Sequence, residues 1–238
     1  MSEVFDVDRI SLSDSCTVVS KKTCYDMDSL PSGGVLLAGN RSFDICDRSG
    51  KITRTIFSKE GDFTSIQCYK QKVYCLLKEP KGSNRRFVIV FDMDTYTECN
   101  RWQLPDYGFV SMLAVNNDKV YVVDSDKKKV IVYNLDGSTY TEICHAEFKN
   151  PVYMCPYHPN GVLISDWSAG MVYKIDCVKD EVDMSFKVPT PRGVYSDKFS
   201  NIWVWSSKEK ALYLRSADGE FCTFVCVFHV YTLYVCSF

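Results

Sequence analysis

The sequence is poor in glycine, proline and histidine, and none of its cysteines form a C-x-x-C pair. With 12 glycines and 8 prolines in 238 residues, collagen-like and low-complexity chains are excluded. The opening stretch, MSEVFDVDRI, lacks an apolar core, so no secretory signal is predicted. The 12 cysteines stand singly within apolar runs, which favours buried free thiols over a disulfide framework or a zinc site. We therefore expect a cytoplasmic chain without a metal or another cofactor.

The chain also has no large excess of positive or of negative charge. The net charge of −2, from 28 Lys and Arg against 30 Asp and Glu, excludes a globally basic nucleic-acid binder but not a local basic face. The chain is 46% hydrophobic and 24% charged, which excludes wholesale disorder. Its 15 Tyr and 14 Phe favour a β-rich domain, because aromatic side chains suit a pleated, half-buried surface.

One pattern repeats five times along the chain. Each unit contains a Val- or Ile-rich run, then a polar turn, then a second β-type run. The first runs are VLLAGN from Val35, VYCLLK from Val73, VYVVDS from Val120, VLISDW from Val162 and IWVWSS from Ile202. Their starts are 38, 47, 42 and 40 residues apart, and the longest spacing contains an insertion in a loop, residues 79–86. Repeats of this length predict the four-stranded blades of a β-propeller, whereas an all-β sandwich would not need the same strand order five times.

The repeats also resemble a known family. The lines LAVNNDKVYVVDSDKKKVIVYNLDG (113–137) and PNGVLISDWSAGMVYKID (159–176) are similar to NHL-type propeller repeats, especially those of invertebrate tripartite-motif proteins. The segment SLPSGGVLLAGNRSFDICDRSGKI (29–52) is similar to the opening blade of that group. The resemblance implies an all-β propeller of about five to six four-stranded blades, incomplete or truncated at its C-terminus.

Three segments are predicted. Residues 1–23 form an N-terminal segment that includes a candidate ring-closing strand, and residues 24–228 form the NHL-like propeller. Residues 229–238 form an apolar tail, interpreted as a remnant of a further blade. No Asp, Glu, Lys or Arg occurs from Phe221 to Phe238. A β-strand is favoured there over a membrane anchor, because His229 interrupts the run and no basic flank is present.

The residues that could carry chemistry are few. In tripartite-motif proteins, ligase activity resides in a RING module with clustered Cys and His zinc ligands, and this chain has no such cluster. His145, His158 and His229 lie in no nucleophile motif. Asp92 and Asp94 have a spacing that could suit a metal, but they fall where a blade turns, so a turn-forming role is predicted. We therefore predict no catalytic residue, no metal ligand and no enzyme.

A basic loop face is the candidate binding site. In a propeller, the loops between strands two and three of a blade share a face with the loops that join successive blades, and bases outnumber acids there. The candidate residues of this basic loop face are Arg41, Arg85, Arg86, Lys127, Lys128, Lys129 and Arg192. Arg85 and Arg86 lie in the inserted loop and Lys127–Lys129 in the equivalent loop of the next blade, so they are expected to form one patch for phosphate or carboxylate groups. The alternative is an ordinary solvated surface, with acids in excess on the opposite face.

The sequence thus predicts a propeller that recognises a protein partner, or alternatively RNA, in the manner of the substrate-recognition modules of tripartite-motif ubiquitin ligases. No membrane association is expected, and the tail is a candidate for self-association. The alternatives are a propeller hydrolase of the gluconolactonase type with a central metal, and a truncated product without function.

Overall fold

The structure, a computed structural model, describes residues 23–80, 83, 85–105 and 110–225. These residues form β-strands, turns and loops, with no helix among them. The first two blades consist of β1 (Cys24–Ser29), β2 (Val35–Gly39), β3 (Ser42–Cys46), β4 (Ile52–Phe57), β5 (Asp62–Tyr69), β6 (Lys72–Lys78), β7 (Arg86–Asp92) and β8 (Glu98–Gln103). The next two consist of β9 (Val110–Asn116), β10 (Lys119–Asp124), β11 (Lys129–Asn134), β12 (Thr139–Cys144), β13 (Pro151–Tyr157), β14 (Gly161–Asp166), β15 (Met171–Asp176) and β16 (Glu181–Lys187). The fifth consists of β17 (Pro191–Ser196), β18 (Ile202–Ser206), β19 (Ala211–Arg215) and β20 (Phe221–Val225).

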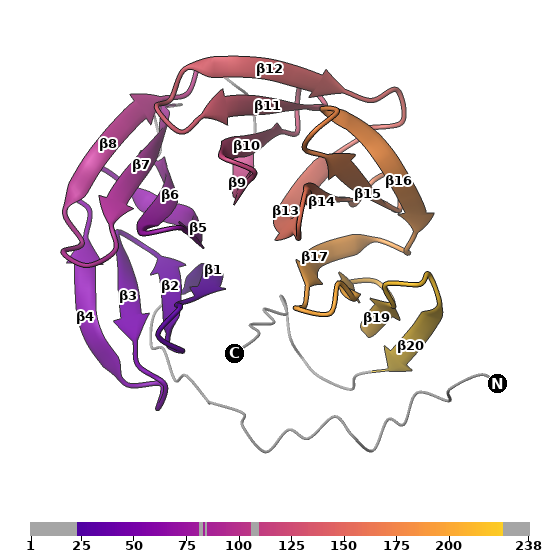
Figure 1. The fold of residues 1–238 in the computed structure, drawn as a ribbon, viewed down its shortest axis with the longest axis horizontal. Helices are drawn as coiled ribbons and strands as arrows, with labels where there is room; N and C mark the ends of the chain where they lie inside the picture. Colours follow the sequence, from indigo (N-terminus) through magenta and orange to yellow (C-terminus); the bar gives the residue numbers. More distant parts are fainter. Residues whose placement is uncertain (1–22, 81–82, 84, 106–109, 226–238) are drawn as a thin grey trace.

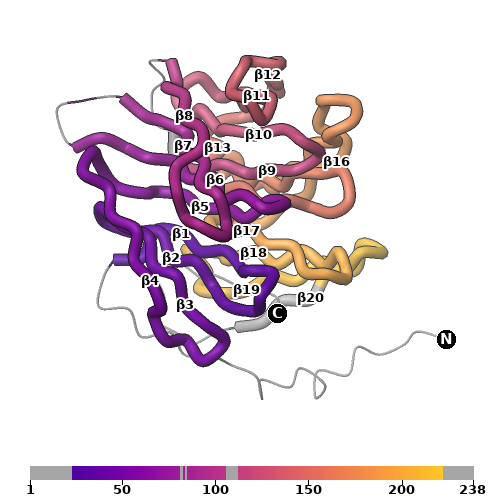
Figure 2. Tube along the Cα trace, turned by 60° about the vertical axis from the view of Figure 1, so that its left-hand side comes forward, coloured from indigo at the N-terminus to yellow at the C-terminus, as the bar shows by residue number. Residues whose placement is uncertain are grey.

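Each blade is a four-stranded antiparallel sheet in which neighbours in sequence are neighbours in space. The five blades follow one another around a central axis, with β1, β5, β9, β13 and β17 innermost (Figure 1). Seen from the side, the chain runs back and forth between two faces, where the turns lie (Figure 2). The predicted all-β propeller with five four-stranded blades is thereby confirmed.

Inner strands of successive blades pack on each other from β1 to β17, but within the described part β1 and β17 do not pack on each other in this way. The predicted ring-closing strand and the tail (229–238) lie outside the described residues, so both stay predictions. Where the chain is described, no helix is long and apolar enough to cross a membrane.

Aspartates shape the turns between the third and fourth strands. Asp92 Oδ1 accepts hydrogen bonds from the backbone N–H groups of Asp94 and Thr95, as predicted for a turn-forming residue. Asp47 and Asp176 make the same kind of contact in their own blades. Asp side chains that bond backbone N–H groups further along the chain favour tight turns, which explains why an Asp recurs at or after the end of the third strand of a blade.

The core consists of apolar layers between neighbouring blades. Phe43 of blade one packs against Phe63 and Phe91 of blade two, with ring centroids 5.3 Å apart in both pairs and edge-to-face geometry. Similar layers join blades two and three, three and four, and four and five. The abundant aromatics and β-branched residues therefore serve to bury the faces of the strands between neighbouring blades.

Candidate functional site: the central channel

Side chains of one inner strand bond the open edge of the next inner strand. Gln67 of β5 accepts from the backbone N–H of Val115 at 2.7 Å and donates to the carbonyl of the same residue at 3.0 Å. Ser65 Oγ accepts from the N–H of Leu113 at 3.3 Å. These bonds satisfy backbone groups on the β9 edge that faces the channel, where no further strand is paired.

Between blades one and two, two carboxylates perform this role. Asp26 Oδ2 accepts from the N–H of Ile66 at 2.9 Å and from Ser65 Oγ at 2.7 Å. Asp28 Oδ2 accepts from the N–H of Cys68 at 2.6 Å. The neutral side chains of Ser65 and Gln67 bond the next inner strand in blade two, whereas two acids do so in blade one.

The second oxygen of each carboxylate explains this difference. Asp26 Oδ1 accepts from the N–H of Met27, and Asp28 Oδ1 from the N–H of Ser29, both at 2.9 Å. Ser29 and Cys68 hold equivalent positions, because each pairs with the first apolar residue of its own second strand. A carboxylate has two acceptor oxygens, so Asp28 bonds the inner edges of β1 and β5 at once, which a single hydroxyl or amide oxygen does less well.

The remaining inner strands have different side chains at the equivalent positions. At the position equivalent to Gln67, β9 has Ala114, and the residue it faces on β13 is Pro156, which has no N–H to bond. Cys155 of β13 lies near the backbone N–H of Ser196 on β17, which acts to lower the pKa of its thiol. The Asp26 and Asp28 pair is thus the one charged member of this series in the described residues.

Burial sets the protonation of these groups. Asp26 is 9% exposed, and loss of solvent raises its pKa to about 7, against the lowering effect of its three hydrogen bonds. Burial raises the pKa of Asp28 to about 7 as well, although part of the residue is exposed. The pKa of the Cys155 thiol is raised by burial and, less strongly, by the charges of Asp26 and Asp28. Near neutral pH the channel therefore holds two carboxyl groups close to half ionisation and a neutral thiol.

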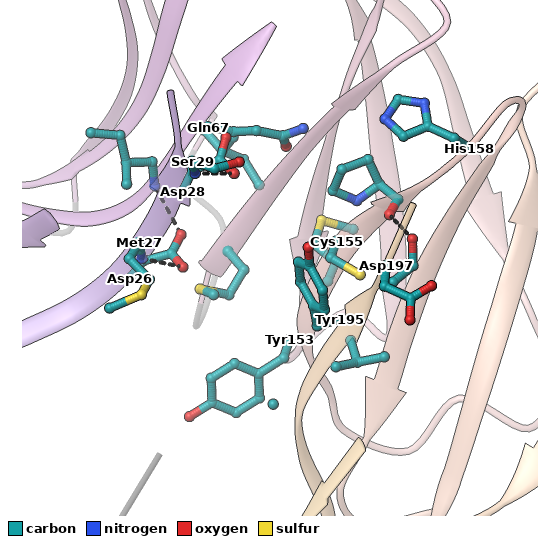
Figure 3. A pocket seen from close by; sticks show the side chains of 18 of the residues that line it. Asp26, Met27, Asp28, Ser29, Gln67, Tyr153, Cys155, His158, Tyr195 and Asp197 are labelled. Atoms are coloured by element: carbon teal, nitrogen blue, oxygen red, sulfur yellow. Dashed lines mark hydrogen bonds between the residues drawn. The ribbon is translucent and has the colours of Figure 1, made fainter. Parts of the chain in front are cut away.

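A cavity of about 230 Å³ lies in this channel. Asp26 and Asp28 lie on one side, while Tyr153, Cys155 and Tyr195 lie on the other side, on β13 and β17 (Figure 3). The cavity extends to the turns that follow β13 and β17, where its lining includes His158, Asp197 and Lys198. The side chain of Asp197 is engaged in its own turn, accepting from the N–H groups of Phe199 and Asn201. The cavity therefore reaches the end of the channel on the face opposite the basic loop face, which we call the opening of the channel.

The channel offers acid–base and hydrogen-bonding groups. Among the described residues, no group of three or more His, Cys, Asp or Glu side chains converges in a way that could hold a metal ion. His145 follows β12 in a loop, where its ring packs beside that of Tyr173. None of the described cysteines is in a disulfide.

The structure places the predicted basic residues in different settings. Arg85 is exposed and forms an ion pair with Glu79 at 3.0 Å. Arg86 is not a loop residue but the first residue of β7, only 8% exposed. Lys129 begins β11 and pairs with Glu142 at 2.6 Å.

The other predicted cations also differ from one another. Arg41, Lys127 and Lys128 are exposed, and Arg192, at the start of β17, is half-buried against the ring of Trp167 at 5.6 Å. All seven residues lie at the ends of strands or in loops, but several of their charges are already paired. Whether they bind a partner stays a prediction.

Comparisons with solved structures bear on the fold. A streptogramin B lyase is similar with a TM-score of 0.68 at 12% identity, covering 90% of this chain and 72% of that chain. A catalytically inactive variant of virginiamycin B lyase from Staphylococcus aureus, solved with quinupristin, is similar at 0.67 and 14% identity, covering 87% and 71%. A protein of unknown function from Bacteroides caccae is similar at 0.67 and 7% identity, covering 84% and 80%. Identities this low show the propeller fold alone.

No protein-family model matches the chain, and no curated protein matches it. The propeller part of the predicted resemblance is confirmed, while its tripartite-motif part has no support from these comparisons. The prediction that the chain is not an enzyme is contradicted, because two of the similar propellers are lyases. It rested on the absence of a RING module, and a propeller can carry catalysis without one.

The acids of the channel were missed in the sequence. Their signal is the run YDMDS at residues 25–29, in which two acids alternate within a strand that an antiparallel propeller places at its axis. Because residues i and i+2 of a strand lie on the same face, the two acids share one face of an innermost strand, which indicates the channel.

Proposed function

We propose that this chain is a recognition propeller whose central channel receives one basic side chain of a protein partner. The observation that carries the proposal is the cavity of about 230 Å³, with Asp26 and Asp28 on its wall. Among the described residues, no ion pair joins either carboxylate to a cation of the chain itself. An entering ammonium group would supply the missing positive charge.

The size of the cavity favours a single side chain over a larger molecule. Pockets for drug-sized ligands have volumes of about 300–1,000 Å³. The channel is smaller, but it has room for the stem and ammonium group of one lysine. Tyr153 and Tyr195 on the opposite wall add aromatic rings, which attract cations in a partly desolvated site.

The test uses a short glycine–serine peptide with one central lysine. Its controls are the same peptide with acetyl-lysine and with norleucine, which keep the stem but lose the charge. We expect the lysine peptide to bind at least about tenfold more tightly than either control, since a charge-assisted contact contributes roughly 1.5–3 kcal/mol. Isothermal titration calorimetry measures the three affinities.

The pH dependence gives a second criterion. Because the pKa of each carboxyl is about 7, binding should be tighter at about pH 8 than at about pH 6, while the lysine stays charged throughout. The double variant Asp26→Asn, Asp28→Asn should remove both the lysine preference and this pH dependence. The control variant Asp94→Asn changes an exposed turn residue and should change neither. Equal affinity for lysine and norleucine peptides would refute the proposal.

The same preparations should be incubated with quinupristin, because a propeller similar to this chain was solved with that compound. Formation of a new product would add an activity to the binding function. The basic loop face is a second candidate for partner binding, supported by the exposure of Arg41, Lys127 and Lys128.

A further inference from the structure

On the face opposite the opening of the channel, blades four and five hold an exposed tryptophan. Trp167 is 42% exposed and lies in the turn between β14 and β15. Hydrogen bonds hold the backbone of this turn. Asp166 Oδ1 accepts from the backbone N–H of Ala169 at 2.8 Å, and the backbone N–H of Trp167 donates to the carbonyl of Asn150. The indole is therefore presented by an ordered backbone.

An arginine lies on the same indole. The guanidinium carbon of Arg192 is 5.6 Å from the centre of the Trp167 ring. The backbone beneath it is held as well, because the carbonyl of Arg192 accepts from Ser165 Oγ at 2.7 Å. A stacked guanidinium keeps its planar fork of N–H donors, which matches the two oxygens of a carboxylate.

Three lysines lie in segments that contact those of Trp167 and Arg192. The backbone N–H of Lys149 bonds Asp166, Lys187 ends β16 opposite Met171, and the N–H of Lys208 bonds Thr190 Oγ1, two residues before Arg192. All three lysines are exposed, and no ion pair involving them or Arg192 occurs among the described residues. We call Trp167, Arg192, Lys149, Lys187 and Lys208 the Trp167 patch.

The acids near the patch reduce its charge only in part. Asp166 is fully buried and bonds backbone N–H groups of the neighbouring loop and of its own turn. Glu209 accepts from the hydroxyl of Tyr213, and Glu147 is exposed beside Lys149. The segments around Trp167 thus carry four cations and two exposed acids.

We propose that the Trp167 patch binds an acidic peptide segment of a partner protein, with a carboxylate on Arg192 and an adjacent apolar side chain on Trp167. The ring supplies apolar contact area, and tryptophan and arginine are the residue types that most often dominate binding energies. This surface is separate from the channel and does not depend on lysine binding there, and it assigns a ligand class to the part of the basic loop face that contains Arg192.

A nucleic acid fits the surface less well. Binding a phosphate backbone requires cations that continue along a groove. On blades two and three, Arg85 is paired with Glu79 and Lys129 with Glu142, so ion pairs interrupt the series of cations on this face, although Lys127 and Lys128 of blade three are also exposed. The patch has the extent of a short peptide.

The test is selection of random peptides displayed on phage against the full chain, followed by affinity measurement of the selected peptides by fluorescence anisotropy. We expect enrichment of Asp or Glu next to an aromatic or aliphatic residue, with affinity that falls as salt rises. Trp167→Ala should weaken binding about tenfold. Arg192→Lys keeps the charge but loses the fork, and should weaken it at least about threefold.

The matched control is Phe199→Ala. Phe199 is 67% exposed and also lies beside a cation, Lys198, but on the opposite face, so its loss should leave peptide affinity unchanged. The proposal is overturned if no peptide is enriched, if the selected peptides lack acidic residues, or if they bind Trp167→Ala as tightly as the unchanged chain. Tighter binding of single-stranded uridine RNA than of any selected peptide overturns it too. Equal unfolding midpoints of the variants show that folding is not the cause.

Discussion

Replacing Asp28 by Asn should change how the stability of the propeller depends on pH. The pKa of Asp28 is raised from 3.8 to about 7 in the folded chain, mainly by burial. A group with a raised pKa binds its proton more tightly when folded, so its contribution to stability is complete below about pH 4 and is lost as the pH rises through about 7.

The magnitude follows from the same values. Each pKa unit corresponds to about 1.36 kcal/mol, so the difference between 3.8 and about 7 corresponds to about 4 kcal/mol between acidic and alkaline conditions. Asn cannot ionise, and its one carbonyl oxygen still accepts from the N–H of Cys68 but leaves the N–H of Ser29 without its acceptor, a loss that does not depend on pH. The variant should therefore lack this pH dependence, so its stability relative to the unchanged chain should rise from about pH 4 upward, by about 1.6 kcal/mol at pH 5 and by about 4 kcal/mol at pH 8.

The assay is urea unfolding at several pH values between about 5 and 8.5, for the unchanged chain, Asp28→Asn and the control Asp94→Asn. The difference in the free energy of unfolding between the first two should grow with pH, and the control should follow the unchanged chain. If the free energies of unfolding of Asp28→Asn and the unchanged chain change in parallel with pH, burial does not raise the pKa of Asp28 in the folded chain, and the reasoning is wrong.

Three further outcomes are expected. Gln67→Leu leaves the N–H and C=O of the β9 edge without a partner and should cost about 2–4 kcal/mol of unfolding free energy in urea, whereas Gln67→Glu, which keeps one acceptor, should cost less. Phe43→Ala opens the layer between blades one and two and should cost about 3–5 kcal/mol by the same method, with Phe43→Leu much milder. Reversing Lys127 and Lys128 to Glu should leave the thermal midpoint nearly unchanged, because both are exposed. If the double reversal also leaves binding of acidic peptide and of RNA unchanged, the basic loop face is an ordinary solvated surface.

The repeats made the fold predictable because a blade is built from contacts close in sequence. Alternating runs, Asp-containing turns and a regular spacing are all local, and each recurs five times, so an error in one unit is corrected by the others. The turn role of Asp92 could be predicted for the same reason: its partners, Asp94 and Thr95, are next to it in the chain.

The site was harder to predict because its contacts join different blades. Asp26 bonds Ile66, which is 40 residues away, and nothing local indicates that the two meet at the axis. The settings of the residues of the basic loop face were not predictable because loop position says nothing of ion pairing: Arg85 forms an ion pair with Glu79, and Arg86 is the first residue of β7. The pairing of Arg192 with Trp167 likewise depends on how blades four and five meet.

The most direct test of channel binding is a ¹³C NMR titration of the side-chain carboxyls of Asp26 and Asp28, with and without the lysine peptide. Without the peptide, both carboxyls should titrate near pH 7. An ammonium group bound beside them favours the ionised form, so both pKa values should fall when the peptide is present at saturating concentration. If the peptide binds and both pKa values stay where they were, the basic side chain does not enter the channel and the proposed function is wrong.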